Sequence, residues 1–106
     1  MSAILAYSFQ TGLTYADAVK LLGADGSGSA RFGEWYERDS AWYSELLSCR
    51  SYRGMWLNLY FFDEETILEL KFDGSESGKA AAESVALKEL LPALGARDIK
   101  PTGSVN

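Results

Sequence analysis

Residues 55–72 alternate between apolar and polar side chains with the two-residue period of β-strands. Two alternating runs flank the acidic segment Asp63-Glu64-Glu65, which predicts a hairpin closed by a tight acidic loop. One side of this predicted hairpin is apolar throughout, and it consists of Met55, Leu57, Leu59, Phe61, Leu68, Leu70 and Phe72. The other side carries Trp56, Tyr60 and Phe62 beside Ile67, Glu69 and Lys71. We expect helices to cover the first side and to leave the second side uncovered.

The beginning of the chain predicts a strand followed by a short helix. Residues 3–9 are rich in Ile, Leu, Tyr and Phe and contain no breaker, as in a buried strand. Thr14 is a suitable N-cap, with Asp17 in the acidic first turn, and Gly23 is a natural stop. The pattern therefore predicts a helix over residues 14–22.

The end of the chain predicts a second helix and an edge strand. Small and apolar residues recur at helical spacing in the Ala- and Leu-rich segment that follows Gly78. This helix should end near Leu91, because Pro92 disfavours helical geometry in the residue before it. Residues 96–100 predict a short charged edge strand, and residues 102–106 a loose tail.

Two internal segments allow more than one interpretation. Residues 32–38 alternate like a strand, whereas 42–47 suits a strand or a helical turn, with Asp39-Ser40 as the break between them. The structure of residues 39–53 is therefore left open by the sequence. The Gly- and Ser-rich residues 24–30 predict a flexible connection rather than a phosphate-binding loop, because no Lys follows at P-loop spacing.

The order of these elements predicts one α+β domain over residues 1–101. It consists of strand, helix, two or three strands, helix and strand, with an antiparallel-rich sheet and both helices on one face. Ferredoxin-like (split βαβ) topology is the best match to this order. A chain of 106 residues is long enough to bury a core of its own without metals or disulfides.

Composition and charge narrow the classes of function. The chain contains no His and has a formal net charge of −5, of which the two halves of the sequence carry −1 and −4. An acidic domain does not attract phosphate backbones, so direct nucleic-acid binding is not expected. No apolar run approaches the ~20 residues of a membrane span. The single Cys49 cannot form an internal disulfide, which favours the reduced cytoplasm.

The sequence contains no recognisable catalytic centre, and we predict that the chain is not an enzyme and uses no cofactor. Without His in the chain, Cys49 lacks its usual activating partner. Three adjacent carboxylates on a strand end do not converge on one ion, so Asp63-Glu64-Glu65 is a poor metal site. The enzymatic alternative is a small-molecule cleft under the Gly- and Ser-rich segment, with a Tyr, a Glu or Cys49 as the reactive group.

The aromatic residues indicate a binding surface instead. All three Trp and 10 of the 14 aromatic residues lie between Phe32 and Phe62. Trp, Tyr and Arg dominate the binding energy of protein interfaces. Either the segment 35–47 or the flexible loop folds over these aromatic residues, or they contact a partner. The candidate protein-binding residues are Trp35, Tyr36, Arg38, Trp42, Tyr43, Arg53, Trp56, Tyr60, Asp63, Glu64 and Glu65.

These observations lead to a functional hypothesis with one main alternative. The small acidic domain, its aromatic residues and its acidic loop predict a protein-binding module that acts as a stoichiometric inhibitor or neutraliser, in the manner of bacterial immunity proteins and phage-encoded inhibitors. The acidic loop favours a basic partner, whose association it would accelerate. The alternative is a structural or adaptor subunit that forms homodimers through Trp56, Tyr60 and Phe62.

Overall fold

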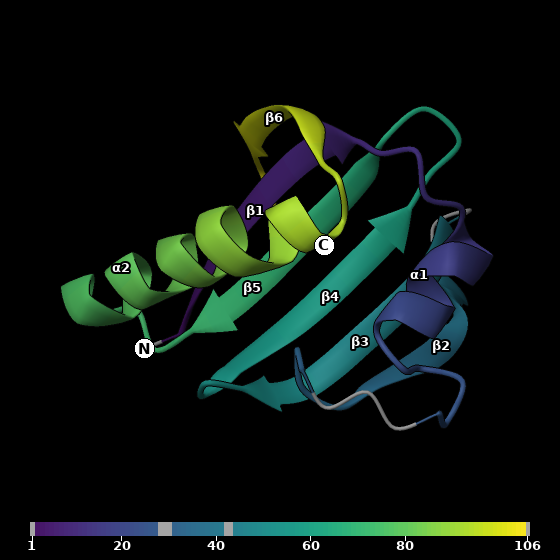
Figure 1. Cartoon of the computed structure of the whole chain (residues 1–106). Helices are drawn as coiled ribbons and strands as arrows, with labels where there is room; N and C mark the ends of the chain where they lie inside the picture. Colours follow the sequence, from purple (N-terminus) through teal and green to yellow (C-terminus); the bar gives the residue numbers. More distant parts are fainter. Residues whose placement is uncertain (1, 28–30, 42–43, 106) are drawn as a thin grey trace.

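A six-stranded antiparallel sheet forms the body of the molecule (Figure 1). The computed structural model describes residues 2–27, 31–41 and 44–105. In chain order, the strands are β1 (Ala3–Gln10), β2 (Trp35–Ala41), β3 (Ser44–Tyr52), β4 (Met55–Phe61), β5 (Thr66–Phe72) and β6 (Arg97–Thr102). Their order in the sheet is β2-β3-β4-β5-β1-β6, so the first strand of the chain lies between the last two.

Helical segments connect β1 to β2 and β5 to β6. The first is α1 (Tyr15–Leu21). The second begins as α2 (Glu76–Ser84), continues as the π-helical η1 (Val85–Leu90) and ends as α3 (Leu91–Ala93). Figure 1 shows both on the same side of the sheet, and their buried residues share one core with the strands. The predicted α+β class, with both helices on one face, is confirmed.

The strand order contains one split βαβ unit. β5 and β6 run in the same direction, because each is antiparallel to β1, which lies between them. The connection through α1 instead passes three strands, β5, β4 and β3, before the chain enters β2. The ferredoxin-like assignment therefore stays a prediction, and the observed architecture is a six-stranded α+β sheet.

Local sequence signals explain where α1 begins and ends. Thr14 Oγ1 accepts a hydrogen bond from Asp17 N at 3.1 Å, and Asp17 Oδ2 accepts one from Thr14 N at 3.0 Å, which together form a capping box. Gly23 follows the helix with a φ of 71°, a conformation that glycine adopts without strain. The predicted helix and its N-cap are confirmed.

The second helical run passes Pro92 and ends at Ala93, two residues beyond the predicted end near Leu91. Helical structure continues to Ala93, and Gly95 follows with a φ of 63°. A proline ring in an α-helix clashes with the carbonyl group four residues before it. The π-helical η1 directly precedes this turn and widens the backbone, which gives the ring the room that a regular α-helix lacks.

β2 and β3 form a hairpin, so residues 39–53 contain strands and the turn to β4 rather than a helical turn. β2 runs through Asp39-Ser40 to Ala41, and the predicted break there is wrong. The pairing of β2 with β3 shifts between Arg38 and Ala41, so the strand continues through an irregularity in the ladder instead of ending. The candidate binding residues Trp42 and Tyr43 lie outside the described residues.

The register of β4 and β5 confirms the predicted assignment of strand faces. Leu57 pairs with Leu70 on the side covered by helices, whereas Trp56 pairs with Lys71 on the opposite side. We call this opposite side, which no described helix covers, the open face. On β1, β3, β4 and β5 it consists of Ile4, Ala6, Ser8, Gln10, Ser44, Leu46, Ser48, Arg50, Trp56, Asn58, Tyr60, Ile67, Glu69 and Lys71.

Candidate functional site

The open face divides into an exposed strip and a covered centre. The strip crosses the sheet at the start of β4, where Trp56 is 41% exposed. On one side of Trp56 lies its cross-strand partner Lys71, which in turn pairs with Ile4 on β1. On the other side of β4, β3 continues past the Cys49–Leu57 pair to Arg50, whose guanidinium lies near the ring of Tyr36 on β2. We call these five residues the Trp56 strip.

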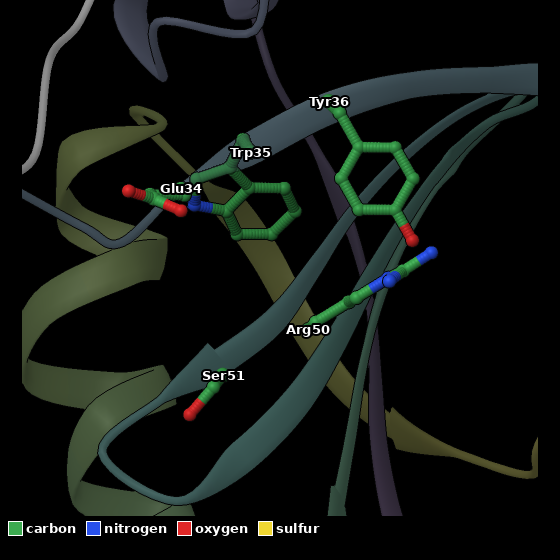
Figure 2. Close-up of a pocket in the computed structure, with 5 residues that line it drawn as sticks. All are labelled: Glu34, Trp35, Tyr36, Arg50 and Ser51. Atoms are coloured by element: carbon green, nitrogen blue, oxygen red, sulfur yellow. The ribbon is translucent and has the colours of Figure 1, made fainter.

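The ring of Tyr36 orients Arg50. The guanidinium carbon Cζ of Arg50 lies 5.6 Å from the centroid of this ring, a cation–π geometry. Figure 2 shows the Arg50 guanidinium beside the Tyr36 hydroxyl group, with Glu34 pointing away from it. Together with Trp35 and Ser51, these residues line a pocket of about 470 Å³. The guanidinium is therefore partly fixed at the edge of a small concave surface.

The C-terminal segment covers the centre of the open face. Tyr60 is only 2% exposed, and its ring stacks on that of Phe62 with centroids 6.1 Å apart. Val105 packs against the buried cluster that contains Tyr60, Leu46 and Ile67. The aromatic residues of this face are thus covered by the end of the chain, which is not one of the two segments that the sequence suggests for this role.

A buried carboxylate holds the C-terminal segment on the sheet. Glu69 is 3% exposed, and its Oε1 accepts hydrogen bonds from Asn58 Nδ2 at 3.2 Å and from the Tyr60 hydroxyl group at 3.4 Å. Its Oε2 accepts from Ser104 Oγ and from Val105 N, both at 3.0 Å. Burial of a carboxylate is costly unless hydrogen-bond donors replace water. The C-terminal segment supplies two of these donors.

The predicted loose tail is therefore corrected in two respects. β6 extends through Pro101 to Thr102, and Thr102 pairs with Ala6 on β1. Ser104 and Val105 then bind Glu69 on the open face. β6 is an edge strand of the sheet, with β1 on one side and no described strand on the other. Edge strands tolerate a proline, which lacks an N–H group, because one side of the strand forms no ladder.

Trp35 lies on the helix-covered side of the sheet, which corrects its assignment as a surface residue. Its side chain is 5% exposed and belongs to the main core. The indole Nε1 donates to the Phe32 carbonyl oxygen at 2.8 Å, so its polar atom is satisfied inside the protein. Trp35 pairs with Cys49, and both residues belong to the core beneath the helices.

The two candidate arginines lie in different surroundings. Arg38 is exposed on β2 and pairs with Leu46, a residue of the open face. Arg53 lies in the turn between β3 and β4, and its Nη2 forms an ion pair with Glu89 Oε1 on η1 at 3.1 Å. The Tyr52 hydroxyl group donates to the same Glu89 oxygen at 2.7 Å. Arg53 therefore connects this turn to the helices and does not join the Trp56 strip.

The acidic hairpin loop lies at the opposite end of β4 from Trp56. Asp63-Glu64-Glu65 is exposed, and Phe62 N donates to the Glu65 carbonyl oxygen at 2.9 Å within the turn. Ser8 Oγ on β1 donates to Glu65 Oε2 at 2.6 Å. The predicted position of the loop is confirmed. However, the loop and the Trp56 strip occupy opposite ends of the sheet and do not form one continuous site.

Two side chains that bear on reactivity lie on the helix-covered side. Cys49 is buried in the core, and this burial raises the pKa of its thiol, which favours the unreactive protonated form. Burial, together with the hydrogen bond from its hydroxyl group to Glu37, raises the pKa of Tyr15. Within residues 2–27, 31–41 and 44–105, no three Cys, Asp or Glu side chains are placed to hold a metal ion. Nor does the described part of the chain contain a helix with the length and apolarity needed to cross a membrane.

Sequence reasoning missed the residues that organise the open face. The alternation of residues 67–72 places Glu69 and Lys71 on this face, but it carries no signal that one is buried and the other exposed. The partners of Glu69 in the C-terminal segment are more than thirty residues away, so no local pattern reveals them. The sequence predicts Ile4 only as part of a buried strand, although it is exposed at the end of the strip.

Comparison with known proteins adds no functional assignment. The chain matches no protein-family model, no curated protein and no solved structure. The candidate function therefore depends on the geometry and charge of the open face.

Proposed function

We propose that this chain is a protein-binding module that acts as a stoichiometric inhibitor or neutraliser, and that the Trp56 strip contacts the partner. The observation that carries the proposal is the exposure of Trp56, which is 41% exposed, whereas Tyr60 on the same face is covered. An exposed indole ring gains free energy when a partner removes it from water. Trp, Tyr and Arg are the residues enriched in interface hot spots, and the strip contains one of each.

The layout of the strip supports a small, specific interface. Trp56 lies at its centre, Ile4 adds apolar surface, and Lys71 and Arg50 lie on the strands on either side of β4. Interfaces commonly combine an apolar centre with a polar rim in this way. The side chains project from paired strands, so little backbone freedom is lost on binding. These properties favour the tight one-to-one association that an inhibitor requires.

The immunity-protein or phage-inhibitor role and the cytoplasmic location belong to the same proposal. The support for the location is the single Cys49, which lies buried and free in the core, as expected for a protein that does not depend on disulfides. The support for the role is the combination of a small rigid fold with one exposed aromatic surface.

Affinity capture followed by reconstitution tests the proposal. Tagged protein is passed through a lysate of the source organism, the retained protein is identified, and the purified pair is analysed by sedimentation. We expect a one-to-one complex and a loss of the partner's activity at the same ratio. Trp56→Ala should weaken the complex by roughly 2 kcal/mol, or about thirtyfold in Kd.

Leu87→Ala is the matched control for this experiment. Leu87 is about as exposed as Trp56, but it lies on η1, on the helical side of the molecule. Its substitution should leave the affinity within about twofold of the parent protein. The proposal is contradicted if both substitutions weaken binding equally, or if the partner binds Trp56→Ala as tightly as the parent.

A second copy of the chain is the alternative partner. Of the residues predicted for a homodimer interface, Tyr60 is buried, Phe62 is partly buried against the same cluster, and Trp56 alone is exposed. A symmetric dimer would have to use Trp56 together with Ile4. Sedimentation at micromolar concentration separates the two candidates, since a strictly monomeric protein removes the homodimer.

A further inference from the structure

We infer that the segment bound by the Trp56 strip is acidic: an extended stretch of a protein partner that places Asp or Glu side chains on Arg50 and Lys71, on either side of Trp56. This inference rests on the proposed function and specifies the chemistry of the partner. It differs from the basic partner that the net charge and the acidic loop predict.

The first argument is the charge of the open face. Arg38, Arg50 and Lys71 are exposed there. Among the described residues, the one ion pair joins Arg53 to Glu89 on the helical side, so these three cations have no carboxylate partner within the described protein. Two acidic residues lie near these cations: Glu69 on β5, and Glu34, which precedes β2 and lines the same pocket as Arg50 but points away from its guanidinium.

Glu69 is not accessible to a partner at this surface. Its carboxylate is 3% exposed and is already bound by four donors. A protein with a net charge of −5 therefore presents a face whose accessible charges, on the four central strands, are positive. Charge complementarity across an interface then favours a partner segment of negative charge.

The second argument is the location of the negative charges. Asp63-Glu64-Glu65 lies at the far end of β4, where Ser8 binds Glu65. Glu76, Glu83 and Glu89 belong to the helical run on the other side of the sheet. These groups are separated from the Trp56 strip by the length or the thickness of the sheet, and salt screens charges beyond roughly 8–10 Å. They therefore do not prevent an acidic segment from binding the strip.

The third argument is the position of the Arg50 guanidinium, which suits the binding of a carboxylate. The Arg50 guanidinium lies at cation–π distance from the Tyr36 ring, and Figure 2 shows it beside the Tyr36 hydroxyl group. A planar guanidinium with its outer edge free binds a carboxylate through two parallel hydrogen bonds. Arg50 and Lys71 lie on the two strands that flank β4, roughly 10 Å apart by strand spacing. Acidic side chains of one extended segment can reach both while its backbone crosses Trp56.

A nuclear magnetic resonance titration of the full, isotope-labelled chain tests the inference. The probe is a synthetic Glu-rich peptide with Leu between the Glu residues, and the controls replace every Glu by Gln or by Lys. We expect the Glu peptide to shift the signals of the Trp56 indole N–H and the Arg50 Nε–H in a saturable manner. The Gln and Lys peptides should leave them unchanged. Higher salt should weaken the binding of the Glu peptide.

Two pairs of substitutions distinguish binding at the Trp56 strip from an effect of the overall charge of the protein. The double variant Arg50→Gln with Lys71→Gln should weaken the Glu peptide about tenfold or more, equivalent to about 1.4 kcal/mol. Lys79→Gln with Lys88→Gln removes the same charge from the helical side and should change the affinity less than twofold, about 0.4 kcal/mol. The inference is overturned if both pairs lose affinity equally. It is also overturned if the Lys peptide shifts the Trp56 signal, or if an oligouridine probe binds the strip more tightly than the Glu peptide.

Substitutions on the Trp56 strip, tested in the captured complex, distinguish failure of this inference from failure of the proposed function. Arg50→Glu with Lys71→Glu should abolish binding of an acidic partner segment. If the complex responds to Trp56→Ala but tolerates this charge reversal, the partner uses the strip without acidic contacts, and the inference alone is wrong. If the complex ignores Trp56→Ala, the proposed function is wrong, and the peptide titration then decides whether the strip binds acidic segments at all.

Discussion

Trp56 and Tyr60 lie on the same face of the same strand, four residues apart, yet the first is 41% exposed and the second 2%. Trp56 pairs with Lys71, at the exposed end of the face. Tyr60 donates to Glu69 and belongs to the cluster over which Val105 packs. Alternation along a strand decides which face a residue occupies. Its exposure is decided by what the rest of the chain places over that face.

The largest expected difference between these two residues is in stability. Tyr60→Ala removes a buried ring and leaves a cavity, so it should lower the free energy of unfolding by about 3–4 kcal/mol. Urea denaturation followed by circular dichroism measures the change, with Trp56→Ala as the paired variant. Similar losses in both variants would show that the two residues are equally buried, against the structure.

Glu69 should account for the next largest effect. Glu69→Ala removes a buried acceptor that four donors share, at a cost of about 2–3 kcal/mol in the free energy of unfolding. Glu65→Ala is the control, because Glu65 is an exposed residue of the turn between β4 and β5. This substitution should lower the free energy of unfolding by less than about 1 kcal/mol. The buried-anchor role of Glu69 fails if the two substitutions cost the same.

Removal of residues 103–106 should have a smaller effect on stability and a visible effect on association. Two donors to Glu69 are lost, but water can replace them, so we expect a cost of about 1–2 kcal/mol. The deletion also uncovers Tyr60 and its apolar neighbours, which should produce concentration-dependent self-association in sedimentation experiments. A truncated protein that is monomeric and fully stable would show that this segment does not cover the face.

Trp56→Ala should have the smallest effect on stability, within about 0.5 kcal/mol, because its ring is exposed and its loss leaves no cavity. The same variant is the one that should lose its partner. Thermal unfolding and a binding assay on one preparation measure both properties. A large loss of stability would place Trp56 in the core and remove it from the proposed interface.

The parts of the fold that could be predicted depend on short-range patterns. Alternation over residues 55–72 predicts the hairpin and both of its faces, and the residues of the capping box predict α1. The position of Trp35 could not be derived in this way, because the strand that carries it was not assigned a register. Its pairing with Cys49 decides the face.

The features that escaped prediction depend on long-range or compensating contacts. Pro92 normally marks the end of a helix, and the π-helical turn before it removes that restriction. The two polar residues Asp39 and Ser40 predict a break, whereas the strand continues there through an irregular pairing. Glu69 and Ser104 are far apart in sequence, so the burial of the carboxylate appears only when the sheet is assembled.

The place of β1 in the sheet has a consequence for how the protein reaches its fold. β1 pairs with β5 on one side and with β6 on the other, so both of its neighbours are strands that follow much later in the chain. During synthesis, β1 is made before the other strands of the sheet. Its apolar residues and its backbone hydrogen-bonding groups therefore stay unpaired until β5 and β6 have been made. Pairings of such large sequence separation slow folding. We therefore expect the β2-to-β5 meander to form early and the insertion of β1 between β5 and β6 to limit the rate.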